Sequence, residues 1–250
     1  MTVAKTRILV VNPNTSSGVT TAFVRAMEAI APQNVDLTGV TGTFGAKIVT
    51  IEAENTVAAY GALDLIAKHA AGCDAVILAI SFDSGLKAAR SVLSMPVVGI
   101  TEAALRSATQ DNRRIGVVFF GEASRRLYED LIESYGITPV GCHAIDIGSV
   151  ADYLAPEAKD QVVLDAVRDL AGAGAETVVI CGAAIVGMAA RLQARAVVPL
   201  YDGLEALEQC LAQIEQLDPP THQYYPPIEP SSNIAPELID LIAGALIKRD

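Results

Sequence analysis

The same succession of residues occurs twice in the chain, about 100 residues apart. Residues 72–105 and 174–207 each pass from a glycine and an acidic residue through an apolar run to a second glycine. An offset of 102 residues places Gly85 on Gly187. Buried strands in general have similar apolar sequences, which explains part of the similarity between the two segments. It does not explain why glycines occur at matching positions in both. A period this long excludes a solenoid and predicts two similar halves.

Short β-branched runs alternate with longer amphipathic segments, a pattern typical of α/β proteins with parallel strands. The expected strands are residues 7–11, 75–80, 96–100, 115–119, 177–180 and 197–200. The run at 75–80 is continuously apolar, as in a strand that is covered on both faces. We therefore expect an α/β fold of two Rossmann-like halves with parallel sheets, related by a pseudo-twofold axis. A ligand would then bind in the cleft between the halves, at the carboxyl ends of the strands.

The order of these segments suggests domain limits. We expect the first half at residues 1–107 and the second at 108–210. Residues 211–233 are rich in proline and are interpreted as a connector. The helical pattern within 234–250 is expected to return and pack on the first half.

Composition excludes several classes of function. The chain has 250 residues and a formal charge of −11, which argues against a nucleic-acid surface. No run approaches the roughly 18 apolar residues of a membrane span, and no signal peptide is evident. The four cysteines are irregularly spaced, so neither a disulfide framework nor a metal site is expected. We expect a cytoplasmic protein without contacts to nucleic acid or membrane.

Cys181 is the first candidate for a reactive group. It follows an expected strand and precedes Gly182 and Ala183, where a helix is expected to start. Free amides and the dipole at a helix N-terminus lower the pKa of a thiol, and small residues let backbone N–H groups approach an oxyanion. The alternative is that Cys181 is a structural core residue.

Two polar loops follow other strands. Asn14, Thr15 and Ser16 offer amide and hydroxyl groups that suit a carboxylate or imide ligand. Taken by itself, the segment is explained better by an Asx turn with a helix cap. Ser81 opens the matching loop after residues 75–80, where ordinary turn residues are the alternative. The sequence shows no phosphate-binding glycine loop of standard spacing and no lysine in a Schiff-base context, so no cofactor is expected.

Taken together, these segments resemble the aspartate/glutamate/hydantoin racemase superfamily, and within it the hydantoin and allantoin racemase branch. The resemblance covers roughly residues 5–210. It rests on ILVVNPNTS (8–16), TIEAE (50–54), DAVILAISFDSGLKAAR (74–90), PVVGITEAA (96–104), ESYGI (133–137), VVICGAAIVGMA (178–189) and PLYDG (199–203).

The resemblance implies cofactor-free chemistry at an acidic carbon beside a carbonyl. Two cysteines of these racemases face each other across the cleft, and Cys181 resembles the second. The positions that hold the substrate's polar groups are matched by Asn14, Thr15, Ser16, Gly182 and Ala183. The first cysteine is replaced: an ungapped alignment puts Ile80 there, and one deleted residue puts Ser81 there, ahead of Phe82. The pair Phe119-Phe120 stands where members often have two threonines, which suggests an apolar part of the substrate.

Three functions remain open at this point. The first is a racemase or isomerase that acts on a hydantoin-like or small carboxylate substrate with Cys181 as acid and base. The second is a lyase similar to arylmalonate decarboxylase, in which Cys181 protonates an enolate. The third is a protein that binds a small molecule in the cleft without turnover. In each case the expected ligand is a small molecule, and we expect a homo-oligomer.

Overall fold

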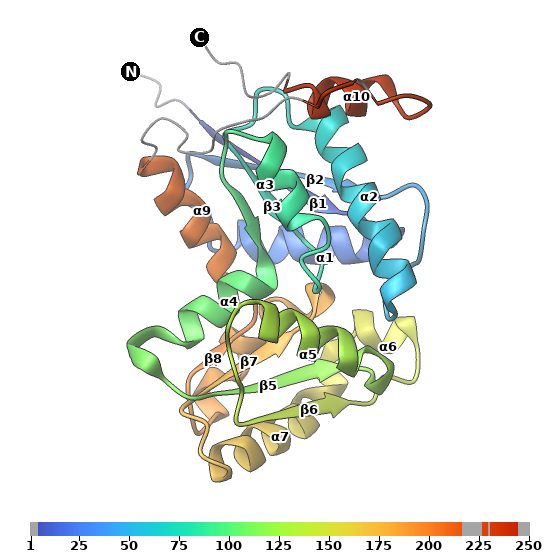
Figure 1. Cartoon of the computed structure of the whole chain (residues 1–250). Helices are drawn as coiled ribbons and strands as arrows, with labels where there is room; N and C mark the ends of the chain where they lie inside the picture. The colour runs from blue at the N-terminus through green and yellow to red at the C-terminus, as the bar shows by residue number, and fades with distance from the viewer. Residues whose placement is uncertain (1–4, 217–226, 230, 245–250) are drawn as a thin grey trace.

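The computed structural model describes residues 5–216, 227–229 and 231–244. Figure 1 shows two α/β halves, one above the other, each built around its own sheet. Each sheet has four parallel strands. The predicted fold class, an α/β protein of two similar halves with parallel sheets, is therefore confirmed.

The first sheet has the strand order β2-β1-β3-β4. Its strands are β1 (Thr6–Asn12), β2 (Val35–Thr41), β3 (Ala75–Leu78) and β4 (Val97–Gly99). Three helices of this half are α1 (Ser17–Glu28), α2 (Glu52–His69) and α3 (Leu86–Val92). The residues of β3 are buried throughout, because helices cover both faces of a parallel sheet.

The second sheet has the order β6-β5-β7-β8, which repeats the first with every strand number raised by four. Its strands are β5 (Ile115–Phe120), β6 (Gly141–Ile145), β7 (Thr177–Cys181) and β8 (Leu200–Tyr201). Its helices are α5 (Arg125–Ser134), α6 (Val150–Leu154), α7 (Asp160–Gly172) and α8 (Met188–Leu192). Short 3₁₀ turns are η1 (Gln110–Asn112), η2 (Glu122–Ser124), η3 (Pro156–Lys159), η4 (Ala183–Ile185) and η5 (Gln193–Arg195).

Side-chain contacts repeat along with the topology. The backbone N–H of Arg7 donates to the carboxylate of Asp74 at 2.8 Å, and that of Arg114 donates to Glu176 at 2.9 Å. Both acidic residues stand at the start of the third strand of their half. The duplication inferred from the sequence thus extends to the bonds that tie neighbouring strands together.

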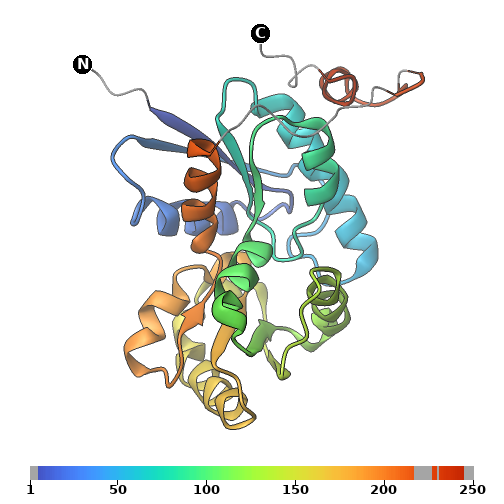
Figure 2. The same ribbon diagram turned by 60° about the vertical axis from the view of Figure 1, so that its left-hand side comes forward.

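The two halves exchange helices. Helix α4 (Ile100–Ala108) follows β4 but packs on β7 and β8, whereas α9 (Glu205–Glu215) follows β8 and packs on β3 and β4. Figure 2 shows α9, in orange, beside the strands of the first half. The side chain of Gln209 in α9 donates to the carbonyl oxygen of Ala103 in α4 at 2.9 Å. Limits at residues 107 and 210 therefore follow the sequence repeat but do not separate two independently packed units.

Two further expectations differ in detail from the structure. Strand β8 starts at Leu200 and not at Val197, whose side chain is 59% exposed; Pro199 has no N–H to donate to a ladder. Residues 211–215 of the expected connector belong to α9, and most of its remainder lies outside the described residues. Helix α10 (Pro236–Ile242) packs on α2 of the first half, and residues 245–250 are not described.

Among the helices of the described residues, none combines the length and the apolar character needed to cross a bilayer.

Candidate functional site

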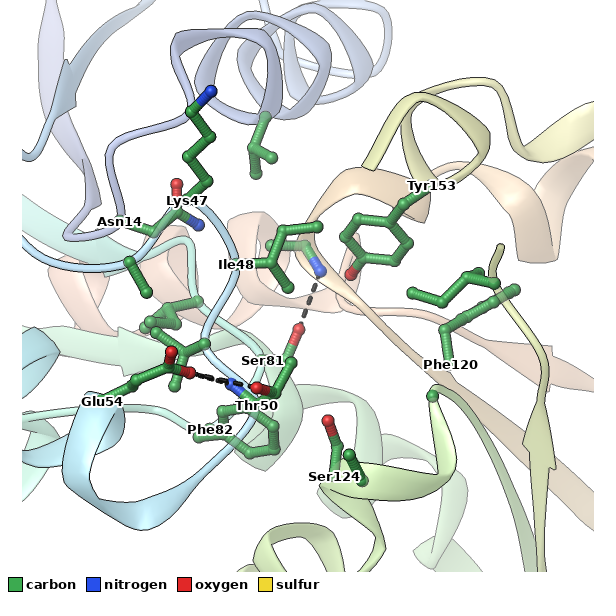
Figure 3. Close-up of a pocket in the computed structure, with 18 of the residues that line it drawn as sticks. Asn14, Lys47, Ile48, Thr50, Glu54, Ser81, Phe82, Phe120, Ser124 and Tyr153 are labelled. Atoms are coloured by element: carbon green, nitrogen blue, oxygen red, sulfur yellow. Dashed lines mark hydrogen bonds between the residues drawn. The ribbon is translucent and has the colours of Figure 1, made fainter. Parts of the chain in front are cut away.

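A cavity of about 660 Å³ lies between the two sheets, at the carboxyl ends of their strands. Its wall combines loops that follow β1, β2 and β3 of the first half with those that follow β5, β6 and β7 of the second. The ends of parallel strands are the usual place for a ligand in such folds. Figure 3 shows that polar side chains of the first half face aromatic side chains of the second across this space.

Ser81 joins the two halves at the centre of the site. Its hydroxyl oxygen accepts a hydrogen bond from the backbone N–H of Ala183 at 2.9 Å, shown as a dashed line in Figure 3. The hydroxyl of Thr101, at the start of α4, donates to the carbonyl oxygen of Ser81 at 2.6 Å. Ser81 is 7% exposed and lines the cavity. Its position is therefore fixed from both sides of the cleft.

Two tyrosine side chains stand beside Ser81 in the cavity wall. Burial raises the pKa of Tyr128 well above its usual value, and it raises that of Tyr153 to about 12, although a hydrogen bond with Ser81 lowers both. Tyr128 lies on α5 and Tyr153 on α6, so both come from the second half. Near neutral pH both phenols keep their protons. They can donate to an oxygen of a ligand but cannot act as bases.

The absence of a side chain at Gly182 leaves room for the phenol of Tyr153. A Cβ atom at Gly182 would lie 2.7 Å from the hydroxyl oxygen of Tyr153 and 2.7 Å from Ile185. The backbone φ of Gly182 is +155°, which side chains rarely allow. We expect Gly182→Ala to reduce the free energy of unfolding by about 1–3 kcal/mol, through strain and overpacking, and to displace the phenol. Urea unfolding measures this, with Gly172→Ala as the control because nothing lies within 4 Å of a Cβ there.

Glu54 supplies a carboxylate to the same cavity. Its Oε2 atom accepts hydrogen bonds from the backbone N–H of Thr50 at 2.8 Å and from the Thr50 hydroxyl at 3.1 Å. Within the described part of the chain, no hydrogen bond reaches Oε1. One oxygen is therefore anchored while the other is available to a ligand. This is the arrangement expected of a positioned proton acceptor.

Asp83 fixes the loop that carries Ser81. Its carboxylate accepts from the Tyr135 hydroxyl at 2.7 Å and from the backbone N–H groups of Glu102 at 2.8 Å and Thr101 at 3.2 Å. A Cβ atom at Gly99 would lie 2.4 Å from this carboxyl group, so only glycine fits there. Burial raises the pKa of Asp83 to about 7 despite these hydrogen bonds.

Cys181 lies in the core at the end of a strand. This residue ends β7, is 2% exposed and does not line the cavity. Burial raises the pKa of its thiol, and the charge of Asp83 raises it further. The expected α-helix after it is the short 3₁₀ turn η4, so no long helix dipole favours the thiolate. The pKa is thus shifted in the direction opposite to the one that we expected, and Cys181 lies in the core. Its role as acid and base stays a prediction.

The remaining predicted residues divide into two groups. Those that line the cavity are Asn14, Ile80, Ser81, Phe82, Phe120 and Ala183. Those that do not are Thr15, Ser16, Phe119 and Gly182. Phe119 is fully buried because it stacks on Tyr128, with ring centroids 4.8 Å apart.

Asn14 forms an Asx turn, and its role in ligand binding stays a prediction. Its Oδ1 accepts from the backbone N–H of Ser16 at 2.9 Å, which is an Asx turn, and also from the side chain of Asn12 at 3.0 Å. Its Nδ2 donates to no described residue. That amide is therefore available as a donor in the cavity, where Figure 3 places Asn14.

Sequence reasoning missed Tyr128, Tyr153 and Glu54 as site residues. The tyrosines lie on helices and not at strand ends, so nothing in the strand pattern marks them. Glu54 had a signal, because it ends the TIEAE segment on which the resemblance partly rested. As for metals, the described residues contain no group of three or more His, Cys, Asp or Glu side chains able to hold an ion.

A duplicated α/β fold with a cavity at the carboxyl ends of both sheets is an arrangement in which small molecules bind. The sequence of residues 8–211 matches the model of the family described as Asp/Glu/Hydantoin racemase. The chain belongs to this racemase family. A hydantoin racemase from Pseudomonas sp. (strain NS671) is 28% identical over 212 residues, which cover 80% of this chain and 82% of that protein.

Solved structures agree with this assignment. An allantoin racemase from Klebsiella pneumoniae superposes with a TM-score of 0.84 at 26% identity, over 94% of this chain and 99% of that one. Arylmalonate decarboxylase superposes with a TM-score of 0.59 at 13% identity, over 85% of this chain and 94% of that one. The second likeness concerns the fold alone.

Proposed function

We propose that this chain is a racemase-type enzyme that exchanges the proton on an acidic carbon beside a carbonyl group. The proposed substrates are hydantoin-like rings or small carboxylates, in keeping with the names of its relatives. The observation that carries the proposal is the cluster at Ser81, where a fixed hydroxyl and two protonated phenols face the same cavity as the carboxylate of Glu54. No cofactor is needed for such a reaction.

Side chains from both halves take part in the proposed chemistry. Removal of a proton beside a carbonyl places negative charge on the carbonyl oxygen, and donors fixed before the reaction stabilise that charge. Tyr128, Tyr153 and Ser81 supply such donors. Glu54 takes the proton on its Oε1 atom while Thr50 holds the other oxygen. The carboxylic acid that results returns a proton to the planar enolate, and return to the opposite face, after the enolate has turned over in the cavity, inverts the carbon. The amide of Asn14 donates to a second polar group of the substrate, and Phe120 contacts an apolar substituent.

A second candidate is binding without turnover. It is favoured by a specific observation: among the described residues, no cysteine lines the cavity. The two-thiol mechanism that the resemblance implies thus has no counterpart here. A lyase that uses Cys181 to protonate an enolate is supported less, because that thiol is buried outside the cavity.

Incubation in D2O separates these functions. Allantoin and 5-substituted hydantoins of one handedness would incorporate deuterium and lose optical rotation under the first proposal. Binding without deuterium uptake would support the second. Arylmalonates would release carbon dioxide only if the chain were a lyase. A homo-oligomer also stays a prediction, which light scattering after size-exclusion chromatography tests.

We expect Cys181→Ala to keep the exchange rate within about threefold of the parent protein, since its thiol does not reach the cavity. In the parent protein, iodoacetamide at pH 7.5 should modify Cys181 more slowly than the half-buried Cys73 and Cys142, because burial protects it and raises its pKa. Peptide mapping by mass spectrometry measures the order of modification. Loss of exchange in a folded Cys181→Ala protein would restore the thiol to the mechanism.

A further inference from the structure

A second cavity, of about 800 Å³, lies on the other side of the loop that carries Ser81. Helices α2, α3 and α4 and the adjoining loop form most of its wall, and α5 of the second half closes it. Phe82 lines both cavities, so one buried ring separates them. Nothing in the proposed reaction uses this second space.

The wall of this cavity carries three cationic side chains, Lys87, Arg90 and Arg106. Arg90 and Arg106 each hold one oxygen of Glu102 at 2.7 Å, and the side chain of Glu102 is 7% exposed. The arginines are more open, with 39% and 59% of their side chains exposed. Glu102 and Glu52 offset two of the three positive charges. Asp83 is a third acid in the wall, but burial raises its pKa to about 7, so below that pH one positive charge is left in excess.

The donors left over have a suitable geometry. Arg90 uses Nε for the carbonyl oxygen of Val97 and Nη2 for Glu102, and Arg106 uses Nε and Nη2 for Glu102. In the described chain, the Nη1 group of neither arginine has a hydrogen-bond partner. An N–H group of a guanidinium donates a charge-assisted hydrogen bond to a carboxylate, and Nη1 of each arginine is free to do so. Since Glu52 and Asp83 are further acids in the wall, a singly charged anion suits the site better than a phosphate dianion.

The rest of the wall is largely apolar, which favours an anion that also carries an apolar group. Phe82, Leu86 and Leu131 line the cavity together with Ala59 and Ala88. Pockets of this kind bury the apolar body of a ligand and orient it by a few polar groups. A bare inorganic anion would leave this surface uncovered.

We propose that this second cavity binds a small carboxylate that carries an apolar group, with the carboxylate on Arg106 and Lys87 and the apolar group against Phe82 and Leu131. The site is distinct from the cavity at Ser81 and does not depend on the proposed reaction. Because the ligand would touch the loop of residues 80–86, the two sites share a wall.

Isothermal titration of the full chain with sodium benzoate tests the proposal, because benzoate combines one carboxylate with an apolar ring. We expect saturable binding, at least tenfold weaker binding of neutral benzamide, and little binding of inorganic phosphate. Arg106→Gln and Lys87→Gln are expected to weaken benzoate binding about tenfold and threefold, as loss of a charged donor does. Arg126→Gln is the matched control, since Arg126 forms an exposed ion pair with Asp130 outside both cavities.

Other results would overturn the proposal. Equal affinities for benzoate and benzamide would show that no cation binds the carboxylate. Unchanged affinity in both the Arg106 and the Lys87 variants would place the ligand elsewhere. Weaker binding in Glu54→Gln, with these two variants unaffected, would assign benzoate to the cavity at Ser81. Because Lys87 is exposed and in no ion pair of the described chain, its variant is expected to fold even if the Arg106 variant does not.

Discussion

Glu54→Gln is expected to lower the rate of deuterium uptake by a hydantoin substrate about 100-fold or more, because a positioned general base contributes 10²–10⁴-fold to such reactions. Glutamine has the same shape as glutamate, and its carbonyl oxygen can still accept both hydrogen bonds from Thr50. The change therefore removes the proton acceptor while it retains the side chain's position. Proton NMR in D2O measures the loss of the substrate's Cα–H signal.

Glu52→Gln is the matched control for this experiment. Glu52 stands two residues before Glu54, in the first turn of α2, and does not line the cavity at Ser81. We expect its exchange rate to stay within about twofold of the parent protein. If Glu54→Gln kept the parent rate, Glu54 would not be the base. If no protein of the series exchanged protons with any substrate, binding without turnover would become the better proposal.

Much of the fold could be predicted from the sequence. The repeat that pairs Gly85 with Gly187 reflects a real duplication, and both glycines have positive φ values where a strand loop turns into a helix. The apolar runs gave six of the eight described strands, with limits that differ by one to three residues. Strands β2 and β6 were missed, because they stand at sheet edges and most of their residues are only partly buried, so no apolar run marks them. The helix exchange of α4 and α9 could not be predicted, because an amphipathic pattern shows that a helix is covered but not by which sheet.

The site was predicted less well, and Cys181 shows why. Side chains alternate along a strand, so Ile180 and Cys181 pack into opposite hydrophobic clusters, and the cavity is reached two residues later at Ala183. The repeat contained this information, since its offset of 102 pairs Ser81 with Ala183. These are the two residues that the structure joins by a hydrogen bond. Cys181 was chosen as a reactive group because it ends a strand. The alternation of side chains along that strand, however, directs it into the core.

The stability of the chain is expected to fall by several kcal/mol between about pH 4 and pH 8. Burial raises the pKa of both Asp83 and Asp202 to about 7 from an ordinary value of 3.8. A raised pKa means that the folded state holds the proton more tightly than the unfolded state. The resulting stabilisation is complete below pH 3.8 and is lost as the pH rises through about 7. A shift of about three pKa units corresponds to about 4 kcal/mol for each group as an order of magnitude.

A carboxylate whose pKa is lowered in the folded state reduces stability at acidic pH, against the trend set by Asp83 and Asp202. The charges of Arg90 and Arg106 lower the pKa of Glu102, although burial opposes them. Stability from this group is present above its ordinary pKa and is lost as the pH falls below it. We therefore expect the free energy of unfolding to be greatest near pH 4, where the loss from Glu102 on the acid side meets the loss from Asp83 and Asp202 on the alkaline side.

Asp83→Asn tests the origin of the trend. The backbone φ at this position is +47°, a conformation that asparagine tolerates, and the variant cannot ionise. Urea unfolding at pH 5 and pH 8 should show about half of the parent's pH dependence, with Asp202 responsible for the rest. Asp130→Asn, which removes an exposed carboxylate, should retain the full dependence. A parent protein that is equally stable at both pH values would show that the two buried carboxyl groups ionise as freely in the folded chain as in the unfolded one.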